Sequence, residues 1–169
     1  FSPKTQYRAG FGPFAPGFPM VPFGDLEAVR KAVNKNTVAV MIEPIQGEAG
    51  VIVPPDGFLR GLRELCSTEN ILLVDDEIQT GLGRTGRLFA ADHEDVRADM
   101  YIIGKALAGG FYPVSAVISS KEVLGVFTPG DHGSTFGGNP LACAVAREAL
   151  RIIIDQKLPQ RAQELGEYF

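Results

Sequence analysis

Three continuously apolar runs, separated by helical patterns, constrain the fold of this chain more than any other feature. They are Val38 to Ile42, Ile71 to Val74 and Met100 to Ile103. A strand with one face in solvent alternates apolar and polar residues, whereas a strand covered on both faces by helices is apolar throughout. The runs therefore predict an α/β fold around a mostly parallel sheet that is covered on both faces.

A fourth apolar run, Val114 to Ile118, departs from this pattern. Only ten residues separate it from Ile103, whereas a parallel crossover needs a dozen or more. We therefore expect one antiparallel strand in the sheet. Helix signals predict helices that begin at Asp25, at about Asp56, at Asn139 with Pro140, and after Pro159.

Composition excludes several classes of protein. The 169 residues are 45% hydrophobic and carry a net charge of −4, so the basic surface of a nucleic-acid-binding protein is missing. The apolar runs are too short to span a membrane. Cys66 and Cys143 lack the spacing of zinc sites or disulfide scaffolds. We therefore expect no metal, no nucleic-acid or membrane partner, and two buried free thiols.

The two ends of the chain indicate a piece of a larger protein. The sequence begins at Phe1 rather than Met and stops at Phe169 without glycine or proline punctuation. No composition break divides residues 1–169, which predicts one domain or part of one. The first residues show no targeting leader, which predicts a cytoplasmic protein, or a mitochondrial-matrix protein if a leader preceded Phe1.

Charged residues follow three of the apolar runs directly. Glu43 follows the first, Asp75 and Asp76 end the second, and Lys105 comes one residue after the third. In open α/β sheets the ligand crevice lies outside the carboxyl ends of the strands, so we expect these side chains to converge there. A structural ion pair that ties off the strand ends is the competing interpretation.

Small residues around Lys105 favour a chemical role. Gly104, Gly109 and Gly110 would let a bulky group approach the lysine. A desolvated lysine amine is a nucleophile suited to Schiff-base formation. Pyridoxal phosphate also requires a carboxylate at its ring nitrogen, and Asp76 is placed for that. The pattern favours a Schiff-base lysine over an ion pair.

A third candidate element is the segment 132–140, HGSTFGGNP, which leads into a predicted helix. Backbone amides, the helix dipole and the hydroxyl groups of Ser134 and Thr135 would suit a phosphate. A plain capped loop explains the same residues equally well. His132 is expected to be a solvated loop histidine.

Two nucleotide-binding patterns compete with this interpretation. Gly81, Gly83 and Gly86 match GxGxxG, but acidic residues separate them from the preceding strand and would repel a pyrophosphate. The apolar strand with an acidic end also resembles the magnesium-binding strand of nucleotide hydrolases. No GxxxxGK followed by Ser or Thr occurs in the chain, so neither pattern is in its proper context.

Four motifs together carry a family resemblance. They are 43–50 (EPIQGEAG), 76–86 (DEIQTGLGRTG), 104–110 (GKALAGG) and 132–140 (HGSTFGGNP). In this order and spacing they resemble the class III aminotransferases, and most closely the ornithine aminotransferases. The resemblance implies pyridoxal 5′-phosphate as cofactor and the large domain of fold type I. It also implies that residues 1–169 are the central part of that domain, without the rest of the large domain or the small domain, and that the segment alone is inactive.

The resemblance also implies roles for single residues. Lys105 would bind the cofactor covalently and shuttle protons, and Asp76 would pair with the ring nitrogen. Gln79 resembles the residue that hydrogen-bonds the 3′ oxygen of the cofactor, and Ile78 the side chain packed on one ring face. Asp75 departs from the family pattern, in which an uncharged residue is usual, and a second buried carboxylate there would raise a pKa.

The remaining implications concern the substrate and the partner. Thr135, with Ser134 beside it, resembles a phosphate contact donated by a neighbouring subunit, which implies a homodimer with shared active sites. Glu48 resembles a glutamate that controls substrate entry, and Glu43 is a further candidate substrate-site residue. Ala49 and the segment 111–115 favour ornithine δ-transamination with 2-oxoglutarate as amino acceptor. N-acetylornithine and 4-aminobutyrate remain alternative substrates, and a nucleotide-binding or non-enzymatic module is a distant third.

Overall fold

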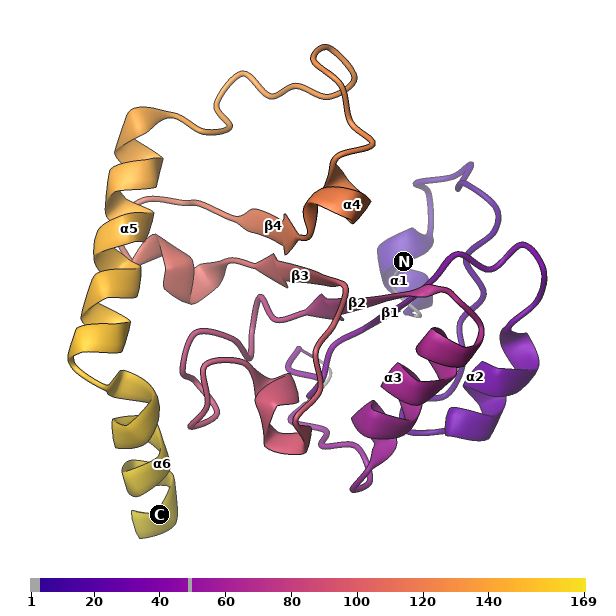
Figure 1. The fold of residues 1–169 in the computed structure, drawn as a ribbon, viewed down its shortest axis with the longest axis horizontal. Coiled ribbons are helices and arrows are strands. Elements are labelled where there is room, and N and C mark those ends of the chain that lie inside the picture. Colours follow the sequence, from indigo (N-terminus) through magenta and orange to yellow (C-terminus); the bar gives the residue numbers. More distant parts are fainter. Residues whose placement is uncertain (1–3, 49) are drawn as a thin grey trace.

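A four-stranded sheet forms the centre of the protein in the computed structural model, which describes residues 4–48 and 50–169. The strands lie in sequence order: β1 (Ala39–Ile42), β2 (Leu72–Asp76), β3 (Met100–Ile103) and β4 (Ala116–Ser119). β1, β2 and β3 run parallel, and β4 runs antiparallel to β3 (Figure 1). The predicted mostly parallel sheet with one reversed strand is confirmed.

Helices α2 (Leu26–Ala32) and α3 (Phe58–Thr68) pack together beside β1 and β2 (Figure 1). The side chain of Asp25 accepts a hydrogen bond from the Ala28 N–H at 2.8 Å and so caps α2, as predicted. α3 begins two residues later than expected, after Gly57. The buried core here comprises Val29, Phe58, Leu59, Leu62, Leu65, Cys66, Ile71, Leu73, Ala91 and Val96.

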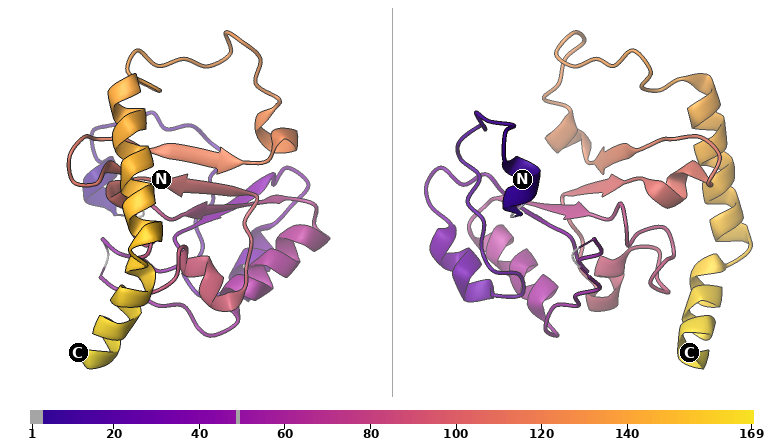
Figure 2. Two further views of the ribbon diagram at one scale, coloured as in Figure 1. Left: turned by 60° about the vertical axis from the view of Figure 1, so that its left-hand side comes forward. Right: turned by 180° about the vertical axis from the view of Figure 1, so that it is seen from behind.

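A second core lies at the other side of the molecule (Figures 1 and 2). The long helix α5 (Pro140–Asp155) packs there against the 3₁₀ helix η2 (Lys105–Ala108), and α6 (Leu158–Tyr168) continues beyond it. The Asn139 side chain accepts from the Ala142 N–H at 2.9 Å, which confirms the predicted cap. This core contains Leu82, Ile103, Leu107 and Ile153.

Three further helices are short. They are α1 (Thr5–Arg8), the 3₁₀ helix η1 (Ala90–Glu94) and α4 (Lys121–Leu124). None of the helices that the structure describes is both long and apolar enough to cross a bilayer.

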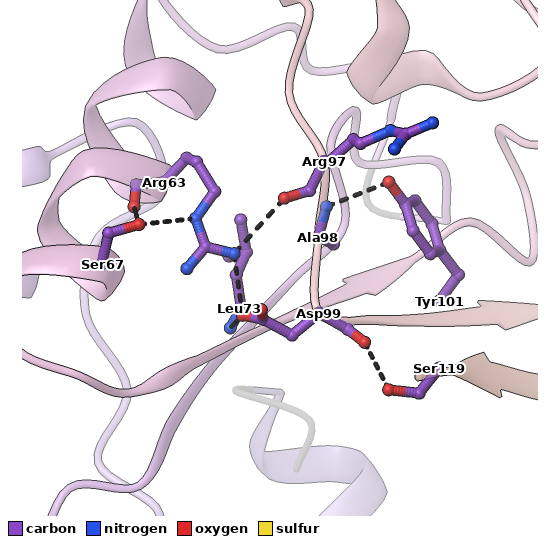
Figure 3. Close-up of polar contacts among 8 residues, drawn as sticks. All are labelled: Arg63, Ser67, Leu73, Arg97, Ala98, Asp99, Tyr101 and Ser119. Carbon is purple, nitrogen blue, oxygen red and sulfur yellow. Dashed lines mark hydrogen bonds and ion pairs between the residues drawn. The ribbon is translucent and has the colours of Figure 1, made fainter. Parts of the chain in front are cut away.

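A polar cluster joins α3 to the amino ends of β2 and β3 (Figure 3). Asp99 Oδ2 accepts hydrogen bonds from Arg63 Nη1 and from the Leu73 N–H, each at 2.7 Å. The Asp99 carbonyl also accepts a hydrogen bond from Ser119 Oγ at 2.5 Å, which ties β4 to the same point. Asp99 therefore fixes the register of the strands at the edge opposite their carboxyl ends.

Two expectations about burial were wrong. Met41 in β1 and Val117 in β4 are about half exposed, so helices do not cover both faces of the sheet in the described residues. Cys66 is buried as expected, but Cys143 is exposed. Leu141 of α5 is exposed as well, because the buried stripe of α5 runs through Ala142, Ala149 and Ile153.

Candidate functional site

The carboxyl ends of the parallel strands meet at one edge of the sheet. Ile42 lies beside Asp75, and Asp76 lies beside Ile102. Lys105 follows two residues after β3 ends, as the first residue of η2. The strand register therefore places the predicted residues at one edge of the sheet, as the sequence indicated.

Lys105 has an unusual backbone conformation. Its φ is +39°, in the left-handed region that residues with a side chain adopt at an energetic cost. The hydrogen bond from the Leu107 N–H to the Gly104 carbonyl, at 2.9 Å, helps to hold this turn. Strain of this kind gathers at functional positions, where the surrounding structure maintains it.

The Lys105 amine contacts two polar side chains. Its Nζ donates a hydrogen bond to Gln79 Oε1 and lies 3.4 Å from Glu48 Oε1. The ion pair with Glu48 is solvated, since the Lys105 side chain is 42% exposed and that of Glu48 is 89% exposed. Such a pair contributes little to stability. An ion pair that ties off strand ends is therefore a poor explanation of this lysine.

Gly47 makes this arrangement sterically possible. A Cβ at Gly47 would lie 2.7 Å from Cγ of Gln79, well inside van der Waals contact. A Cβ at Gly104 would lie 3.5 Å from Cγ2 of Ile78, which is an ordinary contact distance. The absence of a side chain at Gly47 therefore lets Gln79 lie close to the backbone of the loop that carries Glu48.

Glu43 has a local structural contact. Its Oε2 accepts a hydrogen bond from the Gly47 N–H at 3.3 Å. Gln46 and Ile52 close the same loop through two backbone hydrogen bonds of 3.0 and 3.1 Å. Glu43 thus stabilises the loop that carries Glu48 toward Lys105.

Asp76 also contacts the turn that follows its strand. Its Oδ1 accepts a hydrogen bond from the Ile78 N–H at 3.1 Å, and the residue is half-buried. This contact couples the orientation of the Asp76 carboxylate to the turn that carries Ile78 and Gln79.

Glu77 anchors this turn and was missed by the sequence analysis. It is fully buried, with Oε2 accepting from Thr80 Oγ1 at 2.5 Å and Oε1 accepting from the Ala91 N–H at 3.1 Å. Burial raises its pKa, against the lowering effect of these hydrogen bonds. The sequence signal that could have indicated this role is the spacing of Glu77 three residues before Thr80, which lets the two side chains meet within one turn.

Asp75 lies on the opposite face of β2 from Asp76. It is 3% exposed and shares the buried face of the strand with Leu73. Burial first, and then the charge of Glu77, raises the pKa of Asp75 to about 8. The expectation that Asp75 converges with Lys105 was therefore wrong, because successive strand residues point to opposite faces.

Comparison with known proteins identifies the family. The family model described as aminotransferase class-III matches residues 1–169. The chain belongs to the class III aminotransferases.

The similar proteins include ornithine aminotransferases. The chain is 60% identical over 168 residues to ornithine aminotransferase 2 of Staphylococcus saprophyticus, covering 99% of this chain and 42% of that protein. The solved ornithine aminotransferase of Toxoplasma gondii superimposes with a TM-score of 0.96 at 51% identity, over 98% of this chain and 40% of that one. An acetylornithine aminotransferase from Elizabethkingia anophelis superimposes with a TM-score of 0.88 at 53% identity, over 91% of this chain and 41% of that one. The chain thus spans well under half the length of these relatives.

The loop of Ser134 and Thr135 lies apart from the Lys105 contacts in this class III aminotransferase chain. Ser134 Oγ accepts a hydrogen bond from the Gly137 N–H at 2.9 Å, and both hydroxyl residues are exposed. Within residues 4–48 and 50–169, no hydrogen bond joins this loop to Lys105, Gln79 or Glu48. The phosphate contact expected of Ser134 and Thr135 remains a prediction.

A recess of about 1020 Å³ lies elsewhere on the class III aminotransferase chain. It is lined by the segment 86–97 and by residues of α5 and α6, and it contains none of the predicted site residues. Its volume alone gives no reason to prefer it over the chemistry around Lys105, where a strained lysine contacts Gln79 and Glu48.

Proposed function

We propose that this chain is the part of a pyridoxal-phosphate-dependent ornithine aminotransferase that carries the reactive lysine. The enzyme would transfer the δ-amino group of L-ornithine to 2-oxoglutarate, giving glutamate 5-semialdehyde and glutamate. The observation that carries the proposal is the strained, half-exposed Lys105, whose amine contacts Gln79 and Glu48 at the carboxyl edge of the sheet. Residues 1–169 would form the central part of the cofactor-binding large domain.

The residues present fit this cofactor. The missing side chain at Gly47 lets Gln79 lie against the loop that carries Glu48, where its amide contacts the Lys105 amine. Lys105 supplies the amine, Asp76 a carboxylate for the ring nitrogen, Gln79 an amide for the ring oxygen, and Ile78 an apolar surface for one ring face. When bound, pyridoxal phosphate supplies the electron sink that stabilises negative charge on the reacting carbon.

Lys105 would act as both anchor and base. Its Nζ would hold the cofactor covalently and, after release, take the proton from the δ carbon of ornithine. Gln79 and Glu48, which already contact this amine, would orient it. Asp76, held through its contact with the Ile78 N–H, would keep a fixed negative charge at the ring nitrogen.

Glu48 supports ornithine as the substrate. It places a carboxylate 3.4 Å from the reactive amine, and such a charge favours a substrate with a second cationic group. Ornithine carries a free α-ammonium group, whereas N-acetylornithine has lost that charge. Ala49, which also distinguishes the two enzymes in sequence, lies outside the described residues.

Two measurements on the full-length enzyme test the proposal. Borohydride reduction should leave the cofactor on the peptide that contains Lys105, and an unmodified Lys105 would contradict the mechanism. Ornithine should be the better amino donor by kcat/KM, and a strong preference for N-acetylornithine would replace the proposed substrate. Glu48→Gln should narrow the difference between the two donors, because it removes the discriminating charge.

The proposed homodimer with shared sites is supported by the exposed loop of Ser134 and Thr135, which makes no hydrogen bond with Lys105, Gln79 or Glu48 in the described part of its own chain. Mixing inactive Lys105→Ala and Thr135→Val enzymes tests it. If the partner supplies Thr135, each mixed dimer has one intact site, and equal mixing restores about a quarter of wild-type activity. If each subunit uses its own Thr135, mixing restores none.

A further inference from the structure

Asp75 presents a buried carboxyl group for which the proposed chemistry has no use. It lies on the face of β2 that carries Leu73, against the core formed with α3, and is only 3% exposed. Its Oδ1 is buried without a hydrogen-bond partner in the described part of the chain. An ionised carboxylate in that position would be costly, so the group needs either a proton or a donor.

Among the described residues, the charged and titratable groups that face Asp75 include no compensating cation. Glu77 and Asp76 approach along its own chain, Asp92 approaches from η1, and Tyr101 lies beside it on β3. α3 contributes apolar side chains and Cys66, whose charged neighbours are Arg63 and Asp99. Among these groups, Asp75 and Glu77 are two buried carboxyl groups only two residues apart, and burial together with the charge of Glu77 raises the pKa of Asp75, which favours one proton shared between them.

Glu77 links this buried pair to the reactive lysine. Its two oxygens bind Thr80 Oγ1 and the Ala91 N–H, and its carbonyl accepts from the Gly81 N–H at 2.9 Å. These contacts set the turn that carries Ile78 and Gln79. Any movement of the Glu77 side chain therefore reaches Gln79, which contacts the Lys105 amine.

We propose that Asp75 is a positioning residue for the cofactor site, in which its protonated carboxyl group donates a hydrogen bond to Glu77 and so holds the turn that carries Ile78 and Gln79. This inference rests on the proposed function. Loss of the proton would place two negative charges side by side in the core. Their repulsion would displace Glu77, loosen the turn and weaken the hold of Gln79 on the reactive amine.

The test compares the full-length holoenzyme with its Asp75→Asn variant. The asparagine amide donates to Glu77 at every pH and cannot ionise. Affinity for pyridoxal phosphate, measured by fluorescence titration, and kcat for ornithine are followed from about pH 7 to about pH 9. The wild type should lose affinity relative to Asp75→Asn by about threefold to tenfold over this range, because ionisation of Asp75 centred near pH 8 is absent from the variant.

Further variants separate positioning from general instability. Asp75→Ala removes the donor, so it should bind the cofactor more weakly than Asp75→Asn at every pH. The pH profile of its cofactor affinity should show no inflection near pH 8. The exposed Asp56 serves as a matched control, since Asp56→Asn should keep the wild-type pH profile. Should Asp75→Asn fail to fold, difference infrared spectra of the wild type must show a protonated carboxyl band that disappears near pH 8.

The outcomes distinguish this inference from the proposed function. Parallel pH profiles of wild type and Asp75→Asn, with cofactor bound to Lys105 in both, would overturn the role of Asp75 and leave the proposed function intact. Absence of cofactor on Lys105 in the wild type would overturn both. A missing carboxyl band would refute the shared proton directly.

Discussion

Substitution of Gly47 by alanine tests the packing around Lys105 most directly. The new Cβ would lie 2.7 Å from Cγ and 3.4 Å from Cδ of Gln79, where ordinary carbon contacts are about 3.5–4.0 Å. The backbone of Gly47 is outside the left-handed region, so alanine adds no conformational strain of its own. Gln79 must therefore rotate away, and its hydrogen bond with Lys105 Nζ is lost.

The magnitude follows from that hydrogen bond. A hydrogen bond to a charged group contributes about 1.5–3 kcal/mol when buried, and the partial exposure of Lys105 reduces this to about 1 kcal/mol. Residual crowding adds up to about 1 kcal/mol. The sum of about 1–2 kcal/mol corresponds to a loss of roughly 5–30-fold in kcat/KM and in cofactor affinity.

A matched control is available in α3. A Cβ at Gly61 would meet Cδ2 of Leu26 at 2.5 Å, a comparable clash between α2 and α3 that is remote from Lys105. Gly61→Ala should shift the thermal midpoint and leave kcat/KM within twofold of wild type. If kcat/KM of Gly47→Ala also stays within twofold of wild type, or if both variants lose activity equally, the contact between Gln79 and Lys105 does not contribute to catalysis.

Three further predictions concern catalysis, the core and pH. Lys105→Ala should lower kcat by about 10²–10⁴-fold or more, measured by steady-state assay with ornithine, since it removes the proton-transferring amine. Leu62→Ala should reduce the free energy of unfolding by about 2–5 kcal/mol in urea titrations, because Leu62 is fully buried, whereas the exposed Leu141→Ala should change it by at most about 0.5 kcal/mol. Asp75→Asn should gain stability relative to wild type as pH rises from about 4 to about 8. In that window the unfolded wild-type chain has released a proton that the folded chain retains, so wild-type stability declines up to the folded pKa of about 8, as thermal midpoints across pH would show.

The sheet was predictable because burial and loop length leave strong signals. The apolar runs located all four strands, and the ten-residue connection between Ile103 and Val114 correctly indicated the reversal of β4. Position after a strand also placed Asp76 and Lys105 at one edge. The prediction that helices cover both faces failed, since β1 and β4 leave apolar side chains such as Met41 exposed.

The contacts within the site were harder to predict because side-chain geometry decides them. Nothing in the spacing indicates that Gln79 and Glu48 both reach the Lys105 amine, because the loop from 46 to 52 brings Glu48 there from a different strand connection. The prediction that Asp75 faces Lys105 could have been corrected from the sequence pattern alone. Leu73 is a core residue, and a strand repeats every two residues, so Asp75 must share its buried face.

Asp75, Asp76 and Glu77 follow one another at the end of β2, but they do not all point toward Lys105. Strand alternation directs Asp76 away from the buried face that Asp75 occupies, and the turn then buries Glu77 beside Asp75. An extra carboxyl group at position 75 therefore adds no group to the edge where Lys105 lies. It can influence the site only through Glu77, because Glu77 holds the turn that carries Gln79. This geometry requires any functional effect of Asp75 to depend on its protonation, and the pH dependence of that effect to disappear when asparagine replaces it.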